Sequence, residues 1–178
     1  ADYVTDAGTA FELRTKLTKL QYNNAGTWTD LSSAFTTTLD TWMTQANNKM
    51  YILNGTDNTY SYDGSTVADL GASYPKGKYA AWWKNYFFIC GDAAIGATGY
   101  KSRVFFSNLG TPDTMTTGTD FFDVGKSDGQ AITGIWPLGE YLVIFKRKSI
   151  YLMTGANPDA WKLSASVNNI VNIANGIG

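Results

Sequence analysis

The hydrophobic residues of this chain fall into short runs that are separated by glycine-containing turns, and one arrangement of these runs recurs. Each copy has a hydrophobic strand, a turn, an aromatic strand, a glycine and then a large apolar residue. The recurring glycines are Gly26, Gly64, Gly110 and Gly155, at spacings of 38, 46 and 45 residues. Because the blades of β-propellers repeat every ~40–50 residues, this spacing predicts an all-β propeller of repeated blades.

Further strands are expected on both sides of each aromatic strand. Tyr86–Cys90 and Tyr141–Phe145 are continuous apolar runs, which suit strands buried on both faces between neighbouring blades. Flanking strands are expected at Phe11–Leu17, Met50–Leu53, Thr66–Leu70, Lys78–Trp83, Thr119–Val124, Ala131–Trp136 and Ala160–Ser164. The pattern therefore predicts four antiparallel strands per unit, the number in a propeller blade.

The number of blades leaves two arrangements open. Residues 36–70, 78–124 and 131–164 make three blades, and residues 10–31 supply three strands of another. Since closed rings usually have 4–8 blades, a strand at Val167–Ile173 could complete the N-terminal blade and close a small ring. Alternatively the chain is an arc of a larger propeller. We favour the arc, since the two ends of the chain also fit a fragment of a longer polypeptide.

The composition fits one folded domain of this kind. Hydrophobic residues make up 44% of the 178 residues, whereas charged residues make up 16%, below the roughly 25% of an ordinary globular protein. The net charge is −1, so no basic excess supports nucleic-acid binding. No apolar run approaches the ~20 residues that cross a bilayer, so no membrane span is expected.

The stretch Ser102–Met153 resembles a known family. It carries the sequence RVFFSNLGTPD at Arg103–Asp113, FFDVG at Phe121–Gly125, DGQAITG at Asp128–Gly134 and LVIFKRKSIYLMTG at Leu142–Gly155. These segments are similar to propeller proteins of tailed phages, including the tail-nozzle proteins that stabilise packaged DNA in short-tailed phages. The resemblance implies a virion protein of the tail or neck that forms a symmetric ring and contacts other virion proteins, such as tail, portal or adaptor proteins.

Few residues suggest catalysis. The chain has no histidine, which excludes imidazole-based acid–base catalysis and histidine metal ligands. The single cysteine, Cys90, lies in an apolar run and is expected to be buried and unreactive. The only glutamates are Glu12 and Glu140, and most aspartates adjoin glycine or asparagine, which is typical of turns. No catalytic residue, cofactor or metal site is therefore expected.

Two further patterns receive structural interpretations. Asp57-Asn58 and Asp63-Gly64 are faintly similar to a calcium-binding loop. They lack the alternating oxygen ligands of an EF-hand, so no calcium site is expected there. The glycines Gly91, Gly96 and Gly99 lack the Gly-Lys-Ser/Thr ending of a phosphate loop, and a long strand-to-strand loop is expected there.

Five residues are candidates for an interface. Lys146, Arg147 and Lys148 form a basic cluster at an expected hairpin tip, where a solvated turn is the simpler interpretation. Trp83 and Trp136 end inner strands and are expected either in the core or as interface anchors. The loop Ala93–Tyr100 is a further candidate contact.

We therefore expect a non-enzymatic structural protein of a phage tail or neck that assembles into a ring of copies. A carbohydrate-binding propeller and a propeller glycosidase remain alternatives, since exposed aromatic residues also stack on sugars.

Overall fold

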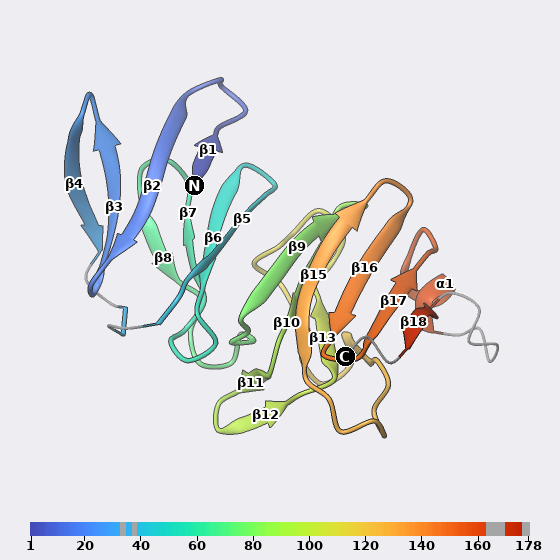
Figure 1. Cartoon of the computed structure of the whole chain (residues 1–178). Helices are drawn as coiled ribbons and strands as arrows, with labels where there is room; N and C mark the ends of the chain where they lie inside the picture. Colours follow the sequence, from blue (N-terminus) through green and yellow to red (C-terminus); the bar gives the residue numbers. More distant parts are fainter. Residues whose placement is uncertain (33–34, 37–38, 163–169, 176–178) are drawn as a thin grey trace.

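In the described part of the chain, four four-stranded antiparallel sheets follow one another along the sequence, and one further sheet has two strands (Figure 1). The structure is a computed structural model, and it describes residues 1–32, 35–36, 39–162 and 170–175. β-strands account for 52% of the chain and α-helix for 3%, which confirms the all-β prediction. No helix in the described part of the chain is long and apolar enough to cross a membrane.

Each of the four sheets has four strands. The first sheet contains β1 (Asp2–Val4), β2 (Ala10–Lys16), β3 (Lys19–Asn24) and β4 (Thr27–Ser32). The second contains β5 (Trp42–Ala46), β6 (Lys49–Leu53), β7 (Tyr60–Tyr62) and β8 (Val67–Asp69). The third contains β9 (Tyr79–Trp83), β10 (Tyr86–Cys90), β13 (Arg103–Phe106) and β14 (Phe121–Asp123). The fourth contains β15 (Ile132–Leu138), β16 (Tyr141–Lys146), β17 (Ser149–Met153) and β18 (Ile170–Asn175).

The predicted blades correspond to these sheets with corrections at three places. The N-terminal unit, predicted as three strands within 10–31, has a fourth strand, β1, which pairs with β2. The expected loop around Gly96 is instead a hairpin of β11 (Ala93–Ile95) and β12 (Thr98–Tyr100). These strands have three residues each, too few for a hydrophobic pattern to reveal them.

The third correction concerns the end of the last unit. The strand predicted at Ala160–Ser164 is wrong, because the short helix α1 (Pro158–Lys162) occupies its described part. Asn157 begins this helix: its Oδ1 accepts a hydrogen bond from the Ala160 N–H at 3.0 Å. Proline at the first helical position and an asparagine cap are recognised helix-start signals, and here they prevail over the repeat.

The last strand, β18, tests the predicted closure of a small ring by the C-terminal segment. The segment proposed to close a ring, Val167–Ile173, is described from Ile170 onward, and β18 pairs with β17, with Ile170 opposite Met153 and Asn175 opposite Ser149. The closure of the N-terminal blade by this segment is therefore wrong. Both terminal sheets are complete without exchanging a strand.

The recurring glycines have the same place in every sheet. Gly26, Gly64, Gly110 and Gly155 each lie between the third and fourth strands of their sheet, and all have positive φ. This agreement confirms that the glycine spacing marks the sheet repeat.

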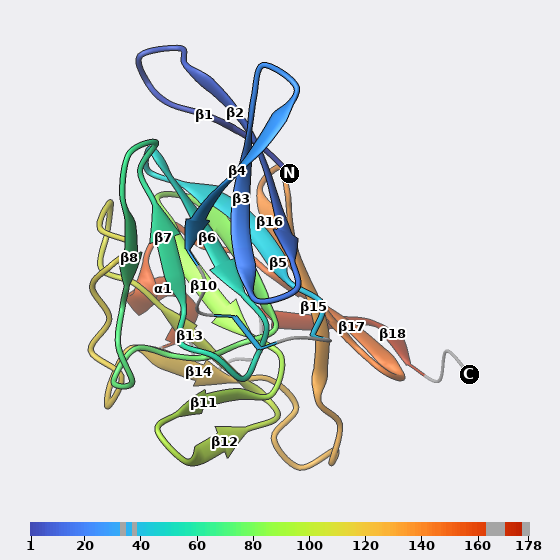
Figure 2. The same cartoon turned by 90° about the vertical axis from the view of Figure 1, so that its left-hand side faces the viewer.

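Successive sheets pack face to face, and three hydrophobic clusters fill the spaces between them. We call the side of a sheet that faces the next sheet in the chain its forward face, and the opposite side its rear face. One cluster joins the first and second sheets, another the second and third, and the largest the third and fourth. Strand β9 lies beside both β5 and β15. The series of sheets can be followed from β4 to β18 in Figure 1, and from the side of the first sheet in Figure 2.

Candidate functional site

The first two strands of the second, third and fourth sheets have the same register, so their positions can be compared directly. Each of these hairpins turns in two residues, and the pairs that flank the turn are Ala46 with Lys49, Trp83 with Tyr86, and Leu138 with Tyr141. The first two turns have positive φ at both central residues, the geometry preferred for two-residue hairpins. Because side chains alternate along a strand, equivalent positions lie on the same face of each sheet.

On the second sheet, the forward face is covered. Tyr51 and Leu53 pack against Phe87 and Ile89 of the third sheet, with the rings of Tyr51 and Phe87 4.5 Å apart. Tyr51 is fully buried and its hydroxyl donates to Asp113. This packing stabilises the fold through burial of apolar surface.

The forward face of the third sheet is covered in the same way. Trp83, Phe88 and Cys90 pack with Ile135 and Ile144 on the rear face of the fourth sheet. Burial here is nearly complete, since the exposed fractions are 4% for Trp83 and 0% for Phe88 and Cys90. A forward face in this protein is therefore normally a buried surface.

The forward face of the fourth sheet is the exception. Leu138, the equivalent of Trp83, is 61% exposed, and Tyr141, the equivalent of the 6% exposed Tyr86, is 43% exposed. Trp136 beside them is 57% exposed, and Phe145 is 37% exposed. In Figure 1 the fourth sheet lies in front of the third and no labelled element is drawn over it. These four side chains form an exposed apolar surface, which we call the fourth-sheet forward face. Val143 on the same face is only 6% exposed, and Trp136 also lines an open pocket with Arg14 of the first sheet and Trp42 of the second.

The opposite end of the series has different chemistry. On the rear face of the first sheet, the guanidinium of Arg14 donates to Gln21 at 2.9 Å and lies 3.8 Å from the ring of Trp28. On neighbouring strands, Lys19 forms an ion pair with Asp30, and Asn23 donates to Glu12. The two terminal faces therefore differ: that of the first sheet carries charged and amide side chains beside Val4 and Trp28, whereas the exposed side chains of the fourth are apolar.

Of the five residues predicted as interface candidates, three lie at exposed positions. Trp136 belongs to the fourth-sheet forward face, and Arg147 and Lys148 are exposed in the turn between β16 and β17. Neither cation forms an ion pair with another described residue. Trp83 lies in the core, one of the two positions expected for it: it is buried, and its indole N–H donates to the Gly139 carbonyl at 3.0 Å.

The interpretation as a solvated hairpin turn is wrong for Lys146, which is buried at the end of β16. It follows Leu142 and Ile144 in the alternation of β16, so its side chain lies on the buried rear face. Its ammonium group donates to the carbonyls of Val124 at 2.5 Å and Gly125 at 3.1 Å, and forms an ion pair with Asp128 at 2.9 Å. Lys146 thus fastens the segment after β14 to the fourth sheet.

The exposed members Leu138, Tyr141 and Phe145 are absent from the sequence-based candidates. The continuous apolar run Tyr141–Phe145 predicts a strand buried on both faces, and that interpretation is correct for the equivalent run Tyr86–Cys90. In β16 the same pattern has a neighbouring sheet on one side only. Strand alternation predicts that Trp136 and Leu138 share a face with Tyr141 and Phe145, but it does not predict that this face is exposed.

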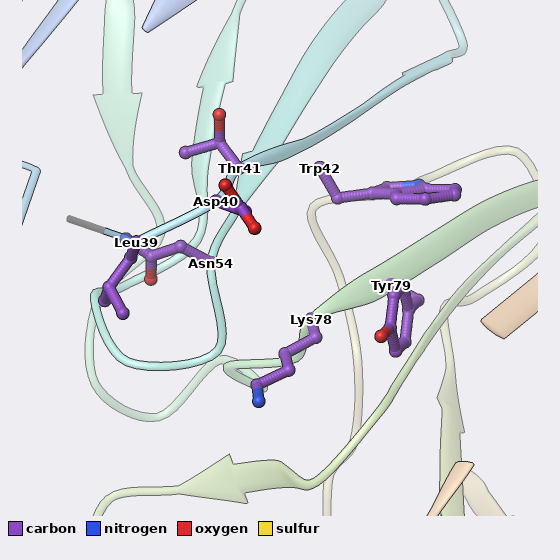
Figure 3. A pocket seen from close by; sticks show the side chains of 7 residues that line it. All are labelled: Leu39, Asp40, Thr41, Trp42, Asn54, Lys78 and Tyr79. Carbon is purple, nitrogen blue, oxygen red and sulfur yellow. The ribbon is translucent and has the colours of Figure 1, made fainter. Parts of the chain in front are cut away.

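A second candidate site is a pocket of about 470 Å³ between the second and third sheets (Figure 3). Asp40 and Asn54 line it from the second sheet's side, and Lys78 and Tyr79 from the third sheet's. The rings of Trp42 and Tyr79 meet edge to face at 5.4 Å. Apolar rings with a few polar groups are typical of small-ligand pockets. Asp40 is the one carboxylate among the lining residues, whereas glycoside hydrolysis normally uses two.

The aspartates interpreted as turn residues have that role. Asp63 accepts hydrogen bonds from the Thr66 and Ser65 N–H groups at 2.7 and 2.9 Å, and these bonds lower the pKa of its carboxyl group. Asp57 accepts from Asn54 at 2.7 Å and from the Thr36 N–H at 2.6 Å. Among the described residues, no three acidic, cysteine or histidine side chains gather as a metal site.

Cys90 is fully buried, and this burial raises the pKa of its thiol. Since the thiolate is the reactive form, we expect native protein to resist a thiol reagent such as dithionitrobenzoate at pH 8. Protein unfolded in guanidinium should react with one equivalent. Labelling of native protein as fast as that of unfolded protein would contradict this prediction.

Comparison of the chain with protein-family models and with curated proteins finds no match.

Proposed function

We propose that the chain is a structural component of a phage tail or neck that packs against other virion proteins and carries out no catalysis. In this proposal the four sheets are blades that form an arc of a β-propeller. The face-to-face packing of successive four-stranded sheets supports the propeller, and the similarity of Ser102–Met153 to phage propeller proteins supports the location.

The observation that carries the proposal is the exposed fourth-sheet forward face. Trp136 and Leu138 are more than half exposed, although the equivalent face of the preceding sheet is buried. The largest exposed apolar patch of a folded protein, commonly about 300–600 Å², is often a functional contact surface. The low charge content, 16% of residues, agrees with a protein whose surface is used for contacts.

The test is to locate the protein in virions. Antibodies raised against the chain should label purified particles of the source phage at the tail or neck in electron micrographs. The protein should also remain with the particles through a density gradient. Particles that carry no label, from a culture in which the chain is detected free in the lysate, would contradict the proposal.

The pocket between the second and third sheets favours a second candidate function, carbohydrate binding. Trp42 and Tyr79 offer ring surfaces, while Asp40, Asn54 and Lys78 offer polar groups for sugar hydroxyls. A glycan array separates the two candidates. Binding that is lost in Tyr79→Ala, by a protein that is missing from particles, would favour the carbohydrate-binding function over the structural one.

A further inference from the structure

We propose that a second copy of this chain covers the fourth-sheet forward face, so that two copies pack through their fourth sheets with a two-fold axis across the strands. The inference rests on the proposed function, because it names the partner that binds the fourth-sheet forward face, the surface on which that proposal depends.

The size of the surface fits a reversible dimer. Its four exposed side chains present on the order of 400 Å² per copy, since a buried aromatic side chain covers about 150–250 Å². Two such surfaces with their polar rims approach the lower limit of about 1,200 Å² for specific interfaces. We therefore expect a weak dimer with a dissociation constant of about 10–100 µM.

Head-to-tail association is disfavoured by the chemistry of the two terminal faces. In that arrangement the fourth-sheet forward face of one copy would lie on the rear face of the first sheet of the next. That rear face carries Glu12, Arg14 and Lys19, which would lose water against Trp136 and Leu138. Pairing of like apolar faces avoids this cost, and two-fold symmetric dimers are the commonest oligomers.

Approach by the face is also favoured over approach by the sheet edge. Strand β15 is an edge strand of the fourth sheet and contains Pro137. Proline lacks an N–H, so this edge cannot present a complete row of donors to an added strand.

The charges at the two ends of the surface set the orientation. Arg147 and Lys148 lie at the turn between β16 and β17, and Glu140 lies at the turn between β15 and β16, at the other end of β16. A two-fold axis across the strands brings the cations of each copy near Glu140 of the other. The side chain of Glu140 is 83% exposed, so its ion pair with Lys84 at 2.9 Å leaves it accessible. In this orientation Trp136, from the middle of the hairpin, lies near the axis.

Sedimentation equilibrium of the purified chain between about 1 and 300 µM tests the proposal. We expect a monomer–dimer equilibrium for the wild type, and at least a tenfold weaker association for Leu138→Lys, because the lysine ammonium group would lose its water in the apolar contact. Leu109→Lys is the matched control, since Leu109 is 62% exposed and Leu138 61%. A monomeric wild type at 300 µM, or equal dimerisation by the two variants, would overturn the proposal.

Charge reversal tests the orientation. Glu140→Lys and Arg147→Glu should each weaken the dimer about two- to fivefold, and the double variant should recover most of the loss, as expected for a rim ion pair. Absence of recovery would overturn the axis across the strands. A monomeric chain that is nonetheless located in virions would refute the dimer alone, whereas a dimer that is absent from virions would refute the proposed function alone.

Discussion

Replacement of Lys146 by methionine is expected to lower the free energy of unfolding by about 3–5 kcal/mol, the usual cost of removing one partner of a buried ion pair. The Lys146 side chain is 0% exposed, and its ammonium group has five described hydrogen-bond acceptors. Methionine matches the length of the lysine stem, so the loss comes from the Asp128 carboxylate and the Val124 and Gly125 carbonyls that remain without their donor.

Urea unfolding followed by tryptophan fluorescence measures this effect as a shift of the midpoint at constant slope. Lys148→Met is the matched control, because Lys148 carries the same charge two residues away but is exposed. The control should change the free energy of unfolding by less than about 0.5 kcal/mol, as is usual for surface positions. Equal midpoints for the two variants would show that the buried ion pair does not stabilise the fold.

The sheet repeat could be predicted from sequence because its signals are local. A glycine between the third and fourth strands, and apolar runs such as Tyr86–Cys90, are visible within a few residues. Strands of three residues, such as β1 and β11, carry too few alternating positions to be recognised. The helix α1 has a local signal too, because Asn157-Pro158 is a typical helix start, and here this signal prevails over the strand that the repeat predicts.

The candidate site could be predicted less completely, because exposure depends on what covers a face. The runs Tyr86–Cys90 and Tyr141–Phe145 have the same apolar character, yet Phe88 is 0% exposed and Phe145 is 37% exposed. The difference arises from position in the series of sheets and not from the residues. Lys146 is the opposite case. Its place in a run of basic residues favours a solvent-exposed side chain, whereas the alternation along β16 predicts a buried one. The alternation determines the orientation that the structure has.

The contrast between buried and exposed tryptophans gives the second large expected effect. Trp161→Ala should lower the free energy of unfolding by about 3–5 kcal/mol, the typical cost of removing a buried aromatic side chain. From α1, Trp161 enters the core between the third and fourth sheets, where its ring lies 4.8 Å from that of Tyr86 and 5.2 Å from that of Phe88. It is 4% exposed.

Two variants distinguish the contribution of the ring from that of the indole N–H. The indole N–H of Trp161 makes no hydrogen bond to any described residue, so Trp161→Phe, which retains an aromatic ring, should cost only about 1–2 kcal/mol. Trp136→Ala applies the larger truncation to a side chain that is 57% exposed, and should cost less than about 1 kcal/mol in the dilute, monomeric protein. Thermal unfolding at about 1 µM, well below the expected dimer dissociation constant, compares the three variants without a contribution from association. If Trp161→Ala proved no more destabilising than Trp136→Ala, α1 would not hold its tryptophan in the core, and the forward face of the third sheet would be covered by the fourth sheet alone.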